Sequence, residues 1–238
     1  MTYGLNLYSD AGLLAFSSAY KSYRLLQKLS LTVQTNSGPS GYSWRFTVTS
    51  TTGNPICFVK PTGTVSGHAG AINILQLGIS GNDYSFSVIT QDTAKVAGSG
   101  PVYVYVFVPG STNGTSYGIN VFDGSGVNTF STNDRLLKIA AYYITIGVNS
   151  GTSTIPSSLS YGSIPSQYAI NSPSIGIKFV NTGGGTTVIL GLGTYVDSSQ
   201  VLQYDAALQI GATGGGPSNP LFIDGSIYIP VIDSSLYD

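Results

Sequence analysis

Short segments in which apolar and polar residues alternate follow one another along most of the chain. A period of two is typical of strands that bury one face. In residues 43–50, for example, Trp44, Phe46 and Val48 are expected on one face of a strand. Alternation, or a short apolar run bounded by Gly and Pro, also predicts strands at residues 55–60, 72–79, 84–90, 102–108, 140–148, 175–181, 186–192, 201–210 and 227–232.

Three segments depart from simple alternation. Residues 102–108 alternate Val with aromatic residues, so this strand is expected to be buried on both faces, between sheets or between subunits. Residues 21–33 begin with a pattern that suits a helical turn, but their later alternation favours a strand. Residues 149–172 are rich in Ser, Gly, Pro and Tyr, and an extended loop is expected there.

A repeat divides the chain into two halves. Residues 3–18 return as residues 117–132, an offset of 117 − 3 = 114, with six of the 16 positions identical. Each copy contains a short alternating run, a turn rich in Asp and Gly, and a second short run. This order predicts a β-hairpin in each half, because Asp and Gly supply the hydrogen bonds and positive φ of tight turns.

The repeat and the alternation together predict an all-β protein with two tandem antiparallel β-sandwich domains that arose by internal duplication. Residues 1–110 form the first domain, residues 111–115 a linker within the Pro/Gly/Ser run 109–115, and residues 116–238 the second domain. The Ser/Gly/Pro-rich loop near 149–172 is an insertion in the second domain. Composition agrees, since all ten acidic residues are Asp, which favours turns, and none is Glu, which favours helices.

The chain carries few charges. Charged residues make up 8% of it, against about 25% in a typical protein, and the net charge is −1. Little repulsion keeps such molecules apart, so we predict a homo-oligomer or a docked subunit of a larger assembly. Nine basic residues against ten acidic ones leave no electrostatic footprint for nucleic acid. No apolar run suits a membrane helix and no signal peptide is visible, so synthesis in a cytoplasm is expected.

Residues that carry chemistry are few and scattered. Cys57 is the only Cys, so it is expected to be a buried free thiol. His68 is the only His, and neither a nucleophile elbow nor clustered metal ligands accompany it. Most Asp residues stand in turns, where their role is structural, so the facing carboxylates of a glycosidase are not expected. We therefore predict no catalytic, cofactor-binding or metal site, and a protein that is not an enzyme.

A basic pair follows each copy of the hairpin at the same offset. The pairs are Lys21 with Arg24 and Arg135 with Lys138. Charges of this kind can protect a solvated strand edge from pairing with another sheet. They can equally form a docking contact that both halves use against a neighbouring subunit, and the sequence leaves both interpretations open.

Two tyrosines in the expected loop, Tyr161 and Tyr168, are candidates for contact with a receptor or a glycan. Tyrosine suits contact surfaces because it combines a large rigid apolar area with a polar tip. The alternative is that both side chains pack back onto the sheet.

The opening segment resembles the start of small tail-tip or tail-fibre-associated proteins of long-tailed, siphophage-like bacteriophages. The shared pattern is Tyr-Gly-Leu-x-Val-x-x-x-x-Gly-x-x-x-Phe-x-Ser, which residues 3–18 follow with Leu7 in the place of Val. Residues 53–61 also look like a recurring piece of that family. The resemblance is confined to these segments and brings no catalytic residue. It implies a virion structural protein whose partners are other tail proteins and, through host attachment, a surface glycan or protein.

The leading prediction is therefore a non-catalytic structural component of a phage tail tip or fibre, located in the virion and without a cofactor. The alternative is a lectin-like, carbohydrate-binding adhesin module that uses the loop tyrosines. A polysaccharide depolymerase is a third hypothesis, and it would require turnover that a single Asp→Asn substitution abolishes.

Overall fold

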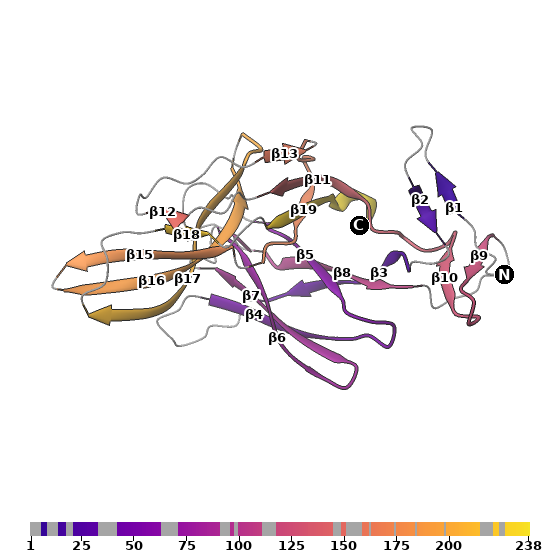
Figure 1. Ribbon diagram of the computed structural model, residues 1–238, viewed down its shortest axis with the longest axis horizontal. Coiled ribbons are helices and arrows are strands. Elements are labelled where there is room, and N and C mark those ends of the chain that lie inside the picture. The colour runs from indigo at the N-terminus through magenta and orange to yellow at the C-terminus, as the bar shows by residue number, and fades with distance from the viewer. Residues whose placement is uncertain are drawn as a thin grey trace.

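The computed structural model shown in Figure 1 is nearly all β, as predicted, and its strands pair antiparallel. A short 3-10 helix, η2 (Ser234–Leu236), follows the last strand. The structure describes residues 6–8, 14–17, 21–32, 42–62, 71–90, 96–97, 100–110, 118–144, 149–150, 159–161, 163–173, 175–183, 185–197, 199–214, 221–223 and 227–238.

The strands of the first half are β1 (Asn6–Tyr8), β2 (Leu14–Ser17), β3 (Tyr23–Leu31), β4 (Tyr42–Thr49), β5 (Ile56–Lys60), β6 (Asn73–Ser80), β7 (Asp83–Thr90) and β8 (Val102–Pro109). Those of the second half are β9 (Asn120–Phe122), β10 (Asn128–Ser131), β11 (Ile139–Ile144), β12 (Asn149–Ser150), β13 (Leu159–Tyr161), β14 (Tyr168–Ile170), β15 (Gly176–Gly183), β16 (Thr186–Val196), β17 (Leu202–Gly214), β18 (Leu221–Ile223) and β19 (Tyr228–Asp233).

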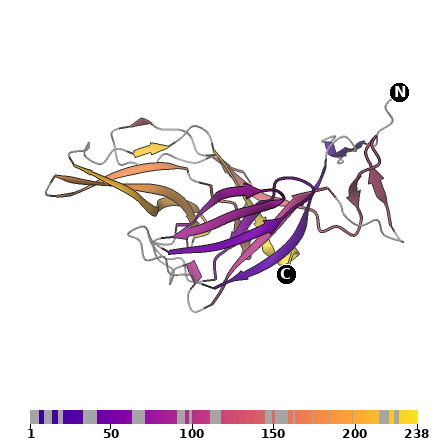
Figure 2. The ribbon, with the colours of Figure 1, turned by 90° about the horizontal axis from the view of Figure 1, so that it is seen from below.

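Three sheets form the body of the molecule. The central one has seven strands in the order β13-β11-β19-β14-β5-β8-β3. A three-stranded sheet, β4-β7-β6, packs against the strands that the first half contributes to this central sheet. A five-stranded sheet, β12-β18-β15-β16-β17, packs against the strands that the second half contributes. Figures 1 and 2 place β15, β16 and β17 at one end of the molecule and the hairpins β1–β2 and β9–β10 beyond the other end.

Every segment whose alternation predicted a strand contains one. The largest difference between prediction and structure concerns residues 21–33. The helical turn predicted at their start is wrong, because strand β3 already begins at Tyr23. The expected extended loop at 149–172 also differs, since its described residues include β12, β13 and β14. These strands have two or three residues, which is too short for alternation to be visible.

Strand β8 is buried on both faces, as its two apolar faces predicted. On one face Val102, Val104 and Val106 pack into a cluster with Trp44 and Val88 of the three-stranded sheet. Trp44 and Val48 of β4 point into the same cluster, and both side chains are fully buried. The valines of β8 therefore belong to a core that the first half builds from two sheets.

The other face of β8 carries the aromatic residues. Tyr105 and Phe107 lie in a cluster with Ile232 of β19 and with Tyr237, which follows η2. Phe107 meets Tyr237 edge to face at a centroid distance of 4.9 Å, a favoured geometry for aromatic pairs. Within the molecule, the C-terminal segment therefore covers this face of the seven-stranded sheet.

A second core belongs to the second half. It joins Tyr143, Ile170 and Ile229 of the seven-stranded sheet to Leu192 and Tyr204 of the five-stranded sheet. The two halves meet in the seven-stranded sheet, where Ile170 of β14 pairs with Val59 of β5. The predicted linker, residues 111–115, lies outside the described residues, and the domain boundary stays a prediction.

The repeated segments form two hairpins with the same register. Asn6 pairs with Ser17 in β1–β2, and Asn120 pairs with Ser131 in β9–β10, so both positions shift by 114 (120 − 6 and 131 − 17). Each hairpin also has an irregularity at the equivalent step of its ladder. The prediction of one hairpin per half is confirmed.

The turn of the second hairpin shows why its residues suit it. The carboxylate of Asp123 accepts hydrogen bonds from the amides of Ser125 and Val127, each at 2.9 Å. Gly126 has φ +79°, a conformation that side chains disfavour. Asp123 therefore has the structural role that its turn context predicted.

Candidate functional site

The two basic segments pair with each other. The amide of Leu25 donates to the carbonyl of Arg135, and the amide of Leu137 donates to the carbonyl of Tyr23, both at 2.8 Å. Tyr23 and Leu137 are equivalent positions of the repeat, since 137 − 23 = 114, and they stand opposite each other. The two basic segments therefore run antiparallel, with Arg24 bridged to Leu136.

The four basic side chains occupy different environments. Arg24 is buried at 8% exposure, and its Nε has no hydrogen-bond partner among the described residues. Lys21, Arg135 and Lys138 are exposed. The structure thus brings the two pairs together along one strand edge, and the docking role predicted for them stays a prediction.

Arg135 and Lys138 hold the C-terminal segment. The guanidinium of Arg135 donates to the carbonyl of Tyr237 at 3.1 Å, and the amide of Lys138 donates to the Tyr237 hydroxyl at 2.8 Å. The same hydroxyl donates to the carbonyl of Leu136 at 2.9 Å. Residues 135–138 therefore hold Tyr237 in the buried aromatic cluster.

The Asp238 carboxylate binds three donors from the first half of the chain. Lys28 and the Tyr105 hydroxyl both contact its Oδ1 at 2.5 Å, and Lys60 contacts Oδ2 at 3.0 Å. Although partial burial opposes ionisation, hydrogen bonds from Lys28, Tyr105 and Lys60 hold the pKa of Asp238 well below its usual range. We call Lys28, Lys60, Tyr105 and Asp238 the carboxylate clamp.

The carboxylate clamp makes the free energy of unfolding depend on pH. The folded pKa of Asp238 is depressed, so its contribution is complete above the ordinary pKa of about 4 and is lost as the pH falls through the folded value. Asp238→Asn is expected to lower the free energy of unfolding by about 1 kcal/mol at pH 7, because the side chain is partly exposed. Urea unfolding of both proteins between pH 7 and pH 2 measures this. The two curves should begin to converge below pH 4 and draw closer toward pH 2, and curves that stay parallel there would contradict the clamp.

The two tyrosines predicted for receptor contact both lie in strands. Tyr161 ends β13, at the register position opposite Tyr142 of β11. Tyr168 begins β14 and packs against the second core, and burial raises its pKa to about 12. This packing is the alternative that the sequence left open, and the receptor or glycan contact predicted for Tyr168 stays a prediction.

The residues with reactive side chains do not gather into a site. Cys57 is a free thiol at 2% exposure, as predicted, and burial raises its pKa to about 12. His68 lies outside the described residues. Within the described ranges, no group of three or more His, Cys, Asp or Glu is placed to hold a metal ion, and no helix is long and apolar enough to cross a membrane.

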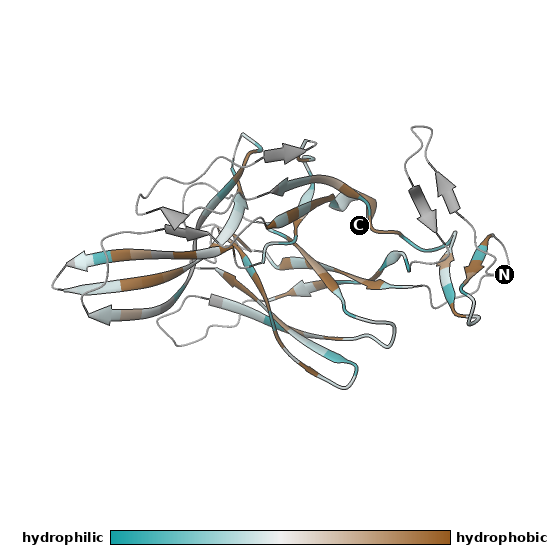
Figure 3. Ribbon diagram, in the orientation of Figure 1, coloured by the Kyte–Doolittle hydropathy of each residue, from teal (hydrophilic) through white to brown (hydrophobic). Residues whose placement is uncertain are grey.

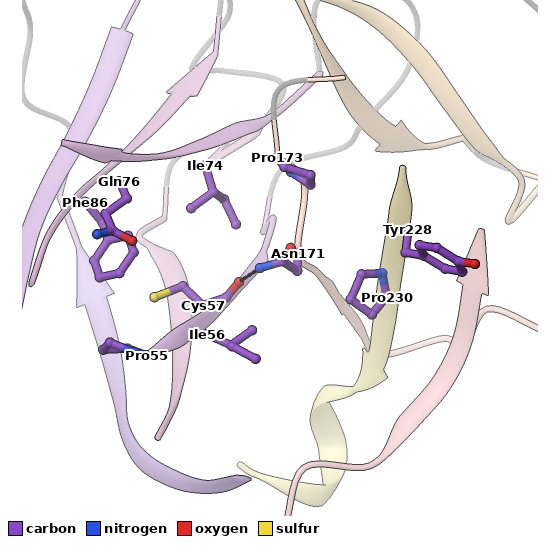
Figure 4. Close-up of a pocket in the computed structure, with 10 residues that line it drawn as sticks. All are labelled: Pro55, Ile56, Cys57, Ile74, Gln76, Phe86, Asn171, Pro173, Tyr228 and Pro230. Carbon is purple, nitrogen blue, oxygen red and sulfur yellow. Dashed lines mark hydrogen bonds between the residues drawn. The ribbon is translucent and has the colours of Figure 1, made fainter. Parts of the chain in front are cut away.

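One pocket, of about 390 Å³, lies where the two halves meet. Figure 4 shows Gln76 and Phe86 of the three-stranded sheet on one side of it and Tyr228 of β19 on the other. Asn171, just after β14, lies between them and donates from its amide to the carbonyl of Cys57 at 2.8 Å. The lining contains no charged residue. No sequence pattern predicted the pocket, because its residues come from distant segments.

Comparison with known proteins found no match. No family model, no curated protein and no solved structure resembles this chain closely enough to be significant.

Proposed function

We propose that the chain is a non-catalytic structural component of a phage virion, in the tail tip or a fibre, which assembles with other tail proteins and contributes to host attachment. The resemblance of residues 3–18 and 53–61 to tail-associated proteins motivates the phage assignment. Small net charge and few charged residues favour a protein that buries much of its surface in an assembly.

The observation that carries the proposal is the apolar surface of the second hairpin. Ile119, Phe122 and Val127 are 61%, 53% and 45% exposed. They sit on or beside a short hairpin set apart from the sheets, and Figure 3 shows hydrophobic colouring on it. Exposed apolar residues on a small projecting element of this kind suit an interaction site.

The apolar character of these positions recurs in the sequence of the first repeat. The equivalents of Ile119, Phe122 and Val127 in the first repeat are Leu5, Tyr8 and Leu13, which are also apolar or aromatic. A chain with two such hairpins can contact two neighbours or contact one neighbour twice, and either arrangement raises the strength of attachment through effective concentration.

We also propose that the halves are duplicated sandwich domains joined edge to edge. Equal hairpin registers at an offset of 114 support the duplication. Two separate cores, each uniting the seven-stranded sheet with a sheet from its own half, support the sandwich arrangement.

Self-association or binding to tail proteins should depend on the hairpin. The triple substitution Ile119→Ser, Phe122→Ser and Val127→Ser is expected to weaken association at least tenfold, because it removes apolar area that an interface would bury. Sedimentation velocity across a concentration series measures self-association, and retention on immobilised phage particles measures binding to the tail.

The matched control is Leu77→Ser, Ile79→Ser and Val201→Ser, which alters three similarly exposed apolar residues at 51%, 55% and 46%, two in β6 and one just before β17. This variant should assemble normally. A wild-type chain that stays monomeric and does not bind particles, or a control that fails as badly as the hairpin variant, would overturn the proposal.

A further inference from the structure

We propose that the pocket between the halves binds a neutral saccharide, with Tyr228 as the stacking residue and Gln76 and Asn171 as the polar contacts. The inference does not depend on whether the protein belongs to a virion. It places carbohydrate binding at residues other than the loop tyrosines that the sequence suggested.

The first argument is the place and size of the pocket. Ligand sites favour interfaces between domains and typically enclose 300–1,000 Å³. This pocket, at about 390 Å³, takes residues from β5, β6, β7, β19 and the segment after β14. Both halves must be folded and joined for the pocket to exist.

The second argument is an exposed aromatic ring at its edge. Tyr228 lines the pocket while remaining 63% exposed, the largest exposed fraction among the exposed large hydrophobic residues of the described chain. Its ring lies 6.4 Å from that of Tyr142, which is 38% exposed, at an interplanar angle of 40°. Two neighbouring exposed tyrosines offer a rigid apolar surface with polar tips, which matches the mixed character of a sugar ring.

The third argument is the polar chemistry of the lining. Gln76 is exposed and its amide can donate and accept. The hydrogen bond from Asn171 to the Cys57 carbonyl fixes the orientation of the Asn171 amide. Amides beside an aromatic ring suit hydroxyl groups, and the absence of charge from the lining favours a neutral sugar over an acidic one.

The test uses the full chain on an array of neutral and acidic glycans, followed by titration calorimetry with the best neutral ligand. Tyr228→Ala should weaken binding at least tenfold, whereas Tyr228→Phe should retain it because the ring is kept. Gln76→Ala should also weaken binding without disturbing the fold, because Gln76 is exposed. Ile79→Ala alters an apolar residue outside the pocket that is 55% exposed; this control variant should bind normally.

Three results would overturn the proposal. They are an array without hits, hits confined to acidic glycans, and binding that survives both Tyr228→Ala and Gln76→Ala. Circular dichroism of each variant shows that a loss of binding does not arise from unfolding.

Discussion

Tyr237→Ala is expected to lower the free energy of unfolding by about 3–5 kcal/mol, the usual cost of removing a buried aromatic side chain. Tyr237 is 3% exposed although it lies next to the last residue of the sequence. Its ring contacts Phe107 and Tyr105, and its hydroxyl makes two hydrogen bonds to the segment around residue 137. Its removal opens the aromatic cluster that covers the seven-stranded sheet.

Urea unfolding monitored by circular dichroism measures the effect. Tyr237→Phe should cost about 1 kcal/mol, because it keeps the ring and loses only the hydroxyl. Leu236→Ala, at a neighbouring residue that is 50% exposed, should change stability by less than about 0.5 kcal/mol. A Tyr237→Ala variant as stable as Leu236→Ala would show that the C-terminal segment does not cover this face in solution.

Ser172→Ala is expected to cost about 3 kcal/mol, because Ser172 links three segments in a buried polar network. Its hydroxyl donates to the Ile72 carbonyl and accepts from the Thr194 hydroxyl, both at 2.6 Å, and the Thr194 amide donates to it at 3.1 Å. Ser172 and Thr194 are fully buried. Ile72 and Thr194 also form a bridge between the three-stranded and five-stranded sheets.

Thr194→Val provides the sharper version of this test. Each single substitution leaves a buried hydroxyl without its partner, whereas the double variant removes both hydroxyls together. The stability cost of the double variant should therefore be smaller than the sum of the two single costs by about 1 kcal/mol. Thr186→Val in the same strand is the control, since Thr186 is exposed and should be nearly neutral. Strict additivity of the two buried substitutions would contradict the network.

Much of the fold could be predicted because its signals are local. The alternation at Trp44, Phe46 and Val48 predicted β4, and the Val/aromatic pattern of β8 predicted burial on both faces. The repeat predicted two hairpins because Asp and Gly in the turn act on their own neighbours, as Asp123 does.

The features that the sequence did not reveal depend on distant residues. Strand β14 has three residues, yet it joins the halves through one pairing of Ile170 with Val59. Asp238 binds Lys28 across 210 positions and Tyr105 across 133. Composition and periodicity carry no information on such pairs, so the carboxylate clamp and the pocket at Tyr228 required the structure.

Among the candidate site residues, the sequence identified the basic pairs but not their arrangement. The shared offset of 114 showed that Lys21, Arg24, Arg135 and Lys138 are equivalent. It could not show that the two segments pair around Tyr23 and Leu137, because a repeat in sequence does not fix how its copies meet.

Immunogold electron microscopy tests the proposed virion location most directly. Antibody to this chain would be applied to phage particles from the culture that produces it, with particles treated with pre-immune serum as the control. The proposed function predicts gold at one end of the tail. Unlabelled particles, with the protein instead free in the medium or on cell surfaces, would contradict it.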